Sequence, residues 1–434
     1  MTMKQYIDET NRMLDFIRQS PSSFHVVRNA MQRLRACGFE ELCLKKRWEL
    51  EPGGKYFTHR NGSSLIAFTL GDNLADTGFR IIASHSDTPT FRIKPLPESV
   101  IDNSLVKFNI EPYGGALLYS WLDRPLSAAG RVVVSTGDAL HPQSVLVDLR
   151  KPLGVIPSVA IHLDRQANDS LSLNKQDDMQ LLVQAVGREV ASVTQLRRII
   201  ASEADLELKS ILDFDLYLYD TERGCIVGSD QTMVLSPKLD NLEMVYASIE
   251  ALCDTAQKPT SKMICIFDNE EVGSATKQGA CSPLLPNIIA RIAGHLGLSR
   301  EDEQRIVYNS FLVSADMAHG VHPNRPQKHD PLLHPTLNGG IVIKVNAAQK
   351  YMTDAVGSGV FRQLCTEAGV PYQLFANRND VGSGSTLGNK LTQQLDITGV
   401  DVGTAILGMH SSRETGGVKD TLYAHQVFKH FLSK

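Results

Sequence analysis

Apolar side chains recur at helical spacing in the first 35 residues and predict two packed helices. The stretch Pro21-Ser22-Ser23, a helix-start signal, separates the two patterns. The apolar positions are Tyr6, Met13, Leu14 and Ile17, and then Phe24, Val27, Met31 and Leu34.

Strand-like apolar runs follow these helices. Residues 56–59 and 64–68 flank an Asn61-Gly62 turn, which predicts a hairpin, and residues 79–83 form a third run that ends near His85. From about Lys94 the residue pattern changes. Strand-like runs are connected by segments rich in turn residues, and one helical stretch extends from about Gln184 to Ile200. The strand-like runs are residues 131–134, 144–147 and 213–218. This region is predicted to be a separate β-rich unit.

After about Ser236, strands and helices alternate. Apolar positions from Leu242 to Leu252 predict an amphipathic helix, and residues 263–267 predict a buried strand. Residues 311–313 and 405–407 are further predicted strands. The pattern is typical of an α/β fold with a mixed sheet flanked by helices.

Length and charge exclude several classes of protein. A chain of 434 residues is long enough for two or three domains. A net charge of -4 without a dense basic run argues against nucleic acid as a partner, and no apolar run is long enough for a membrane span. Charges in the first 20 residues do not fit a signal peptide, so a cytoplasmic location is expected. The seven cysteines form no Cys-x-x-Cys pair, so no thiolate zinc site is indicated.

Polar side chains follow directly after the apolar runs. In an open α/β sheet, ligands bind where loops leave the carboxyl ends of the strands. Another carboxylate, Asp240, comes just before the predicted helix, where it could instead be only a helix cap. The groups after the strands are His85 and Asp87, Asp268 to Glu271, Asp316 and His319, and His410 and Glu414.

Glu270 and Glu271 are adjacent acids, which repel each other unless one is neutral or a cation lies nearby. A solvated acidic turn is the alternative. With a metal present, one carboxylate can be a ligand while its neighbour acts as a general base. Two imidazoles and three carboxylates suit zinc, cobalt or manganese. Asp240 could bridge two ions, with His85 and Asp316 completing one and Glu271 and His410 the other.

These segments resemble the aspartyl aminopeptidase family of dinuclear-zinc exopeptidases. The motifs are His85-Ser-Asp87, Pro237-Lys-Leu-Asp240-Asn241, Asp268-Asn-Glu-Glu271, Ser314-Ala-Asp316-Met-Ala-His319 and Met409-His410-Ser-Ser-Arg-Glu414. The resemblance implies two zinc ions, for which cobalt or manganese could substitute, bound by His85, Asp240, Glu271, Asp316 and His410. It implies Glu270 as the base.

The resemblance also implies a domain organisation. The catalytic domain would consist of residues 1–93 and 233–434, and residues 94–232 would be an inserted dimerisation domain. Dimers of the family assemble into a tetrahedral dodecamer that acts on peptides.

Three side chains have both a structural and a functional interpretation. Asp87 could orient His85 or merely form a turn, and His162 could be a core histidine. In the family, the residue that matches His162 reaches a neighbouring subunit's active site. Lys344 could face solvent from its strand, whereas the matching family lysine pairs with an acidic first residue of the substrate.

His319 and Met409, within the matching motifs, are further predicted substrate-binding residues. One departure concerns Gly382-Ser383-Gly384, where the family commonly has Pro-Cys-Gly. This change alters the loop beside the predicted substrate pocket, so it bears on the preference for acidic residues and not on the metal ligands. A neutral aminopeptidase, a carboxypeptidase or other amidohydrolase on the same zinc pair, and a metal-bound scaffold without turnover are the rival interpretations.

Overall fold

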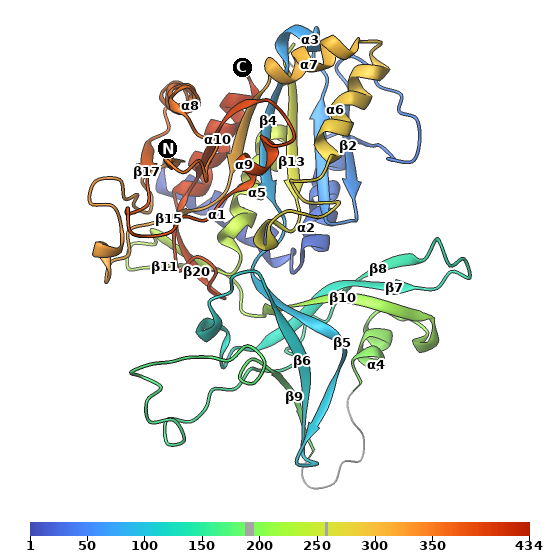
Figure 1. The fold of residues 1–434 in the computed structure, drawn as a ribbon, viewed down its shortest axis with the longest axis vertical. Coiled ribbons are helices and arrows are strands. Elements are labelled where there is room, and N and C mark those ends of the chain that lie inside the picture. The colour runs from blue at the N-terminus through green and yellow to red at the C-terminus, as the bar shows by residue number, and fades with distance from the viewer. Residues whose placement is uncertain (187–194, 257–258) are drawn as a thin grey trace. The chain divides into compact units, whose positions relative to one another are not determined.

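The computed structural model describes residues 1–186, 195–256 and 259–434. These residues form two compact units (Figure 1). The first comprises Met1–Asp87, Gly224–Met409 and Glu414–Lys434, and the second comprises Thr88–Arg223 and His410–Arg413. The sequence-based boundaries, after residues 93 and 232, fall a few residues later along the chain than the limits of these units.

A nine-stranded mixed sheet forms the centre of the first unit. Its order is β1 (Glu40–Glu41), β2 (Lys55–Arg60), β3 (Ser64–Thr69), β13 (Ser261–Phe267), β4 (Phe79–His85), β14 (Phe311–Ala315), β18 (Thr398–Gly403), β16 (Ile341–Lys344) and β17 (Tyr372–Phe375). Strands β13, β4, β14 and β18 run parallel, and β16 runs antiparallel to β18. The predicted α/β fold with a mixed sheet is confirmed.

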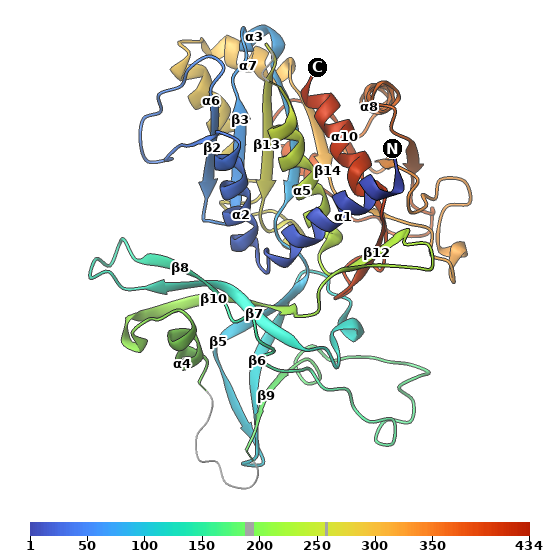
Figure 2. The same cartoon turned by 180° about the vertical axis from the view of Figure 1, so that it is seen from behind.

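Helices cover both faces of this sheet, and alternate residues of its strands feed two separate cores. In β13, Ile264 and Ile266 enter one core, whereas Met263 and Cys265 enter the other. Helices α5 and α10 lie in front of the sheet in Figure 2, and α6 covers the opposite face. This alternation is the period-2 pattern of a strand that is buried on both sides.

The helices of the first core are α1 (Met3–Arg18), α2 (Ser23–Ala36), α5 (Leu239–Asp254), α8 (Ala355–Ala368) and α10 (Asp420–Leu432). Those of the second core are α3 (Leu74–Thr77), α6 (Leu284–His295), α7 (Arg300–Tyr308) and α9 (Leu387–Leu391). The first unit also contains a five-stranded sheet of β11 (Cys225–Val227), β12 (Met233–Ser236), β20 (Glu414–Gly417), β19 (Ala405–Leu407) and β15 (Ala318–His319).

The second unit is built on a six-stranded antiparallel sheet with its own apolar core. The strand order is β8 (Gln143–Asp148), β7 (Leu126–Val134), β10 (Ile211–Asp220), β5 (Thr90–Ile101), β6 (Leu105–Tyr113) and β9 (Leu181–Ala185). Helix α4 (Leu196–Glu203) packs on this core through Leu196 and Ile200. The predicted β-rich character of this region is therefore observed.

One predicted element of the second unit is wrong in part. Gln184, the expected start of a helix, lies in strand β9, and the observed helix begins at Leu196. Residues 187–194, in the middle of that expected helix, lie outside the described residues. The apolar run Leu181-Leu182-Val183 suits a strand, because it pairs with β6 and covers the apolar core of this unit.

None of the helices in the described part of the chain combines the length and apolar character that a membrane span requires.

Candidate metal centre

Three adjacent parallel strands of the first unit end in the predicted site residues. His85 is the last residue of β4, Glu270 and Glu271 begin three residues after β13, and Asp316 directly follows β14. Since β4 lies between β13 and β14, the carboxyl ends of all three strands meet at one edge of the sheet. The strand order therefore gathers residues that are far apart along the chain.

Asp240 reaches the same place from the start of helix α5. Its backbone is not helical (φ -81°, ψ 106°), and Lys238 is the residue that precedes the helix. The Asp240 amide donates to Glu414 Oε2 at 3.0 Å, and Asn241 Nδ2 donates to Ala315 O at 2.9 Å. These two bonds tie the first turn of α5 to strands β20 and β14.

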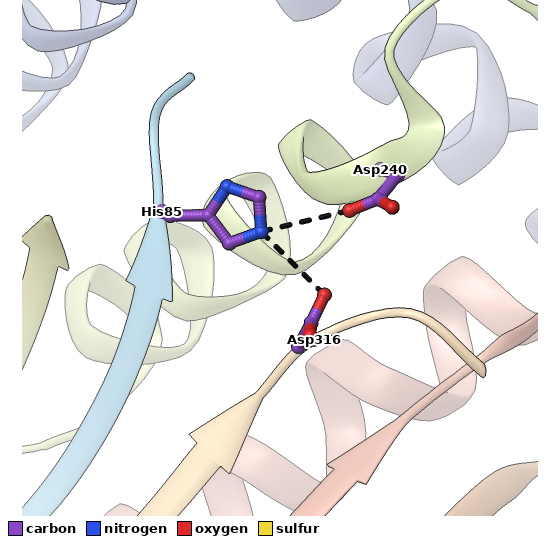
Figure 3. A group of neighbouring side chains, drawn as sticks. All are labelled: His85, Asp240 and Asp316. Atoms are coloured by element: carbon purple, nitrogen blue, oxygen red, sulfur yellow. Dashed lines mark ion pairs between the residues drawn. The ribbon is translucent and has the colours of Figure 1, made fainter. Parts of the chain in front are cut away.

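His85 lies between two carboxylates (Figure 3). Its Nε2 is 3.6 Å from Asp240 Oδ1 and 3.5 Å from Asp316 Oδ1, and all three residues are buried. A second group of potential ligand atoms overlaps the first, because His85 also lies with Glu270 and Glu271. Within each group the ligand atoms are within 4.8 Å of one another.

The atoms present fit divalent metal ions. His85 Nε2 is buried and makes no hydrogen bond to any residue that the structure describes, which is costly for an imidazole nitrogen unless it binds something else. Four carboxylates and one imidazole suit zinc, cobalt or manganese, and these ligands lack the thiolates of a closed structural site.

Asp87 supports the cluster from the adjoining loop. Its Oδ1 and Oδ2 accept hydrogen bonds from the backbone amides of Glu270 and Glu271, both at 3.1 Å. Its Oδ1 also lies 3.4 Å from His85 Nδ1. The backbone oxygen of Asp87 is closer to His85 Nδ1, at 3.1 Å. Asp87 therefore orients the imidazole through its backbone and its carboxylate, and the carboxylate holds the backbone of the two acids, which favours the orienting role over a mere turn.

The pKa values of the buried acids in this cluster favour the binding of cations. Burial raises the pKa of Glu270 to about 8, and burial followed by the charge of Asp240 raises the pKa of Glu271 well above its usual value. Burial also works to raise the pKa of Asp316, but the charge of Lys344 and the adjacent imidazole of His85 hold it below the usual value. Burial opposes the charge on His85, yet Asp316 and Asp87 raise its pKa. Cations bound here would neutralise this concentration of acids.

Lys344 is not the solvent-facing lysine that one interpretation expects. It ends strand β16 and is only 2% exposed. Its Nζ donates to Asp316 O at 3.0 Å and to Met317 O at 3.1 Å. The lysine therefore contacts the segment that carries a predicted metal ligand.

The other predicted substrate-binding residues have different environments. His319, in β15, is exposed and packs edge-on against Phe375, with ring centroids 5.9 Å apart. Met409 is half-buried against the first core. Gly382 and Gly384 flank Ser383 in a loop where an added Cβ would meet open space, so this loop does not require glycine at either position.

Two predicted site residues belong to the second unit. His162 lies in an exposed turn, so both the strand-like context and the core-histidine interpretation are wrong. His410 has a positive φ of 69°, and its Nδ1 lies 3.2 Å from Gly115 O. That contact leaves Nε2 as the nitrogen for a metal. His410 stays a predicted ligand.

Among the buried acids that sequence reasoning missed is Asp401 in strand β18. Its Oδ1 accepts from Thr386 Oγ1 at 2.5 Å and its Oδ2 from the Met352 amide at 2.6 Å. The signal was present, because a single carboxylate in the apolar run Gly-Val-Asp-Val-Gly must find partners in the interior.

Comparisons with known proteins agree with this geometry. Residues 16–432 match the model of the family described as "Aminopeptidase I zinc metalloprotease (M18)". A probable M18 family aminopeptidase 2 of Clostridium acetobutylicum is 44% identical over 432 residues, which are 99% of this chain and 100% of that protein. A probable M18 family aminopeptidase 2 of Ectopseudomonas mendocina is 40% identical over 424 residues, which are 97% of each chain.

Solved structures show the same fold. A chain in the cryo-EM structure of the Ape4 and Nbr1 complex has a TM-score of 0.94 and 35% identity, over 100% of this chain and 87% of that one. The mApe1 dodecamer of S. cerevisiae gives a TM-score of 0.85 at 29% identity, over 98% of this chain and 97% of that one.

Proposed function

The chain belongs to the aminopeptidase I zinc metalloprotease (M18) family and is a zinc-dependent aminopeptidase, and on that premise we propose that it removes acidic residues, Asp or Glu, from peptide N-termini with two zinc ions. The observation that carries this proposal is the convergence of His85, Asp240, Glu271 and Asp316 around one buried edge of the sheet, with Glu270 beside them. The sequence adds His410 as a fifth ligand.

In the proposed mechanism of peptide hydrolysis, the metal ions, Glu270 and Asp87 have different roles. Zinc ions in this cluster supply Lewis acidity and lower the pKa of bound water. Glu270 takes a proton from the attacking water and returns it to the leaving amine. Its high pKa of about 8, caused by burial, is that of the cluster without metal, and nearby dications would lower it. Asp87 holds the backbone of Glu270 and so fixes the base relative to His85.

The preference for acidic residues rests on positive charge near the site. In the proposed arrangement, two dications balance three carboxylate ligands and one hydroxide, and Lys344 adds one positive charge. Its ammonium is buried beside Asp316. A substrate carboxylate would compensate that charge, whereas a leucine side chain would not.

Assembly is a further part of the proposal. The yeast relative is a dodecamer, and we expect this chain to form dimers through its second unit and dodecamers of those dimers. The exposed His162 would then reach a neighbouring subunit's site. Light scattering after gel filtration measures the mass, and a monomer that is fully active would contradict this role.

The test of function is hydrolysis of aminoacyl chromogenic substrates with Asp, Glu, Leu or Ala, before and after chelation. We expect preference for Asp and Glu, loss of activity on chelation, and recovery with zinc or cobalt. Leu preference would contradict the acidic specificity and leave the zinc chemistry standing. Hydrolysis of N-terminally blocked peptides would instead indicate a carboxypeptidase.

Glu270→Gln tests the base. General-base catalysis contributes roughly 100- to 10,000-fold, so kcat should fall by about that factor while the zinc content stays at the wild-type level. Glu301→Gln, at the exposed start of α7, is the matched control and should behave as wild type. Near-wild-type turnover of Glu270→Gln with full zinc would refute the assignment.

A further inference from the structure

Lys344 is a buried ammonium whose hydrogen bonds all lie toward one short segment. Its Nζ donates to the carbonyl oxygens of Asp316 and Met317, at 3.0 and 3.1 Å. The third close oxygen, at 3.5 Å, is Asp316 Oδ2. An ammonium has three N–H donors, of which the two carbonyl oxygens accept two, and the Asp316 carboxylate adds an ion pair.

The two oxygens of the Asp316 carboxylate face different groups. Oδ2 lies toward Lys344 Nζ, whereas Oδ1 lies 3.5 Å from His85 Nε2 (Figure 3). Rotation of the carboxylate would separate Oδ2 from the lysine and move Oδ1 away from the imidazole. The two oxygens are chemically equivalent, so the ammonium favours an orientation of the carboxylate, the one in which one oxygen faces the lysine and the other faces His85.

Other groups keep the ammonium in this place. Nζ lies 5.3 Å from the centroid of the Tyr351 ring. The buried carboxylate of Asp401 contributes a second negative charge, and it is itself held by Thr386 Oγ1 and the Met352 amide. The ammonium therefore has hydrogen-bond acceptors and a carboxylate within the protein itself, without any partner from the substrate.

We propose that Lys344 is a positioning residue for the metal ligand Asp316, in addition to any effect of its charge on substrate preference. The inference rests on the proposed dinuclear site. Its basis is that the ammonium bonds to the backbone of residues 316 and 317 and faces one carboxylate oxygen, which directs the other toward His85. A substrate carboxylate that bonded to Nζ directly would have to compete with three oxygens already within 3.5 Å.

Lys344→Met tests this role, because methionine has similar length but neither charge nor donor. Loss of an outer partner of a metal ligand typically weakens metal binding by about 10- to 100-fold, and we expect that loss of zinc affinity here. Competition with a fluorescent chelator measures it in the full-length protein. The value of kcat should fall for Asp and Leu substrates alike, because weaker zinc binding affects both, whereas an effect of the lost charge on preference would appear only in the KM for Asp substrates.

Lys262→Met is the matched control. Lys262 is equally buried, at 1% exposed, but lies at the start of strand β13 and donates to Ala256 O, away from the predicted ligands. It should bind zinc as the wild type does. Circular dichroism of the metal-free variants verifies that each one folds.

Lys344→Gln is a second variant in case methionine prevents folding. It keeps an amide donor without charge, and we expect zinc affinity between those of the wild type and Lys344→Met. Wild-type zinc affinity in a folded Lys344 variant, with a higher KM for acidic substrates only, would overturn the inference and leave the proposed function intact. A wild-type protein that binds no zinc would refute the proposed function instead.

Discussion

The predicted ligands of the first unit and the predicted ligand of the second are held in different ways. In the first unit, His85 and Asp316 end or follow buried parallel strands with helices on both faces. In the second, His410 belongs to the short segment His410–Arg413, which is fixed by loop contacts: the Leu117 amide donates to His410 O at 2.9 Å, and the Ser412 amide donates to Ser120 Oγ at 2.8 Å.

This difference indicates how rigidly each unit holds its predicted ligands. Strands within a nine-stranded sheet cannot shift alone without disturbing two cores, whereas a four-residue segment held by loops can adjust at the cost of a few hydrogen bonds. Arg413 strengthens that segment through bonds to the backbone oxygens of Glu222 and Arg223, at 3.1 and 2.8 Å. We therefore expect the first unit to determine zinc affinity and the second to modulate it.

The largest expected effect comes from Asp316→Asn. The variant keeps the size of the side chain but removes a charge that faces both His85 and Lys344, so zinc affinity should fall by more than the roughly 100-fold typical of outer partners. His410→Asn is the counterpart in the second unit and should lower the zinc content from two ions to one. Metal analysis of the dialysed proteins measures both. Equal losses in the two variants would contradict the division of roles.

The next largest effect is the pH dependence of the free energy of unfolding, which we assign to a residue of the first unit. Glu243, on helix α5, is completely buried, and burial raises its pKa from 4.5 to about 7. Between these values the unfolded chain releases a proton that the folded chain keeps, so the free energy of unfolding decreases as pH rises and levels off above pH 7. The decrease amounts to about 3 kcal/mol.

Glu243→Gln should remove the contribution of Glu243 to the slope of the free energy of unfolding against pH, because glutamine does not titrate. Urea unfolding at pH 5 and pH 8 measures it, with Asp76→Asn, at an exposed ion pair with Arg305, as a control that keeps the slope. An unchanged slope in Glu243→Gln would assign the pH effect to other groups.

Asp87→Asn should have a smaller effect, about 10- to 100-fold on zinc affinity or on activity. The amide keeps one acceptor oxygen but cannot accept from both Glu270 and Glu271, and its charge near His85 is lost. Calorimetric titration with zinc gives the affinity. An unchanged affinity and an unchanged kcat together would show that Asp87 only forms the turn.

The smallest effect is expected from Ser120→Ala in the second unit. It removes the hydroxyl that accepts from the Ser412 amide, so unfolding should become easier by about 0.5–1.5 kcal/mol while zinc binding by the first unit is retained. Thermal unfolding followed by circular dichroism detects the change. Ser104→Ala, at an exposed turn of the same unit, controls for loss of a hydroxyl. Loss of all bound zinc in Ser120→Ala would mean that the second unit controls the whole centre.

Much of the first unit could be predicted because its pattern is local. The apolar spacing of α1, α2 and α5 and the runs of β2, β3, β4 and β13 were visible in the sequence, and so was the rule that polar residues after strands gather at one edge. Strands β5 and β6 were not recognised. Pro95 and Pro97 interrupt the pattern of β5, and a register shift lies between Ile93 and Glu98.

Contacts between distant segments were beyond prediction from this one sequence. The bonds from Asp87 to the Glu270 and Glu271 amides join residues more than 180 positions apart, and no local pattern indicates them. Lys344 was expected to face either solvent or substrate, because a strand position gives the side of the sheet but not the partner at the end of a long side chain. The structure shows that its ammonium donates to the backbone oxygen of Asp316, a partner that the sequence did not indicate.

The chain passes from one unit to the other between Asp87 and Thr88, and Asp87 itself accepts hydrogen bonds from the backbone of the predicted site residues Glu270 and Glu271. A miniaturised enzyme made by joining Asp87 to Gly224 through a short linker would therefore keep His85, Asp240, Glu271 and Asp316. The remaining segment His410–Arg413 would lose Gly115, Leu117 and Ser120, which now restrain it. Such a truncated protein should bind one metal ion firmly and the other weakly, which makes the excised unit a determinant of cofactor stoichiometry.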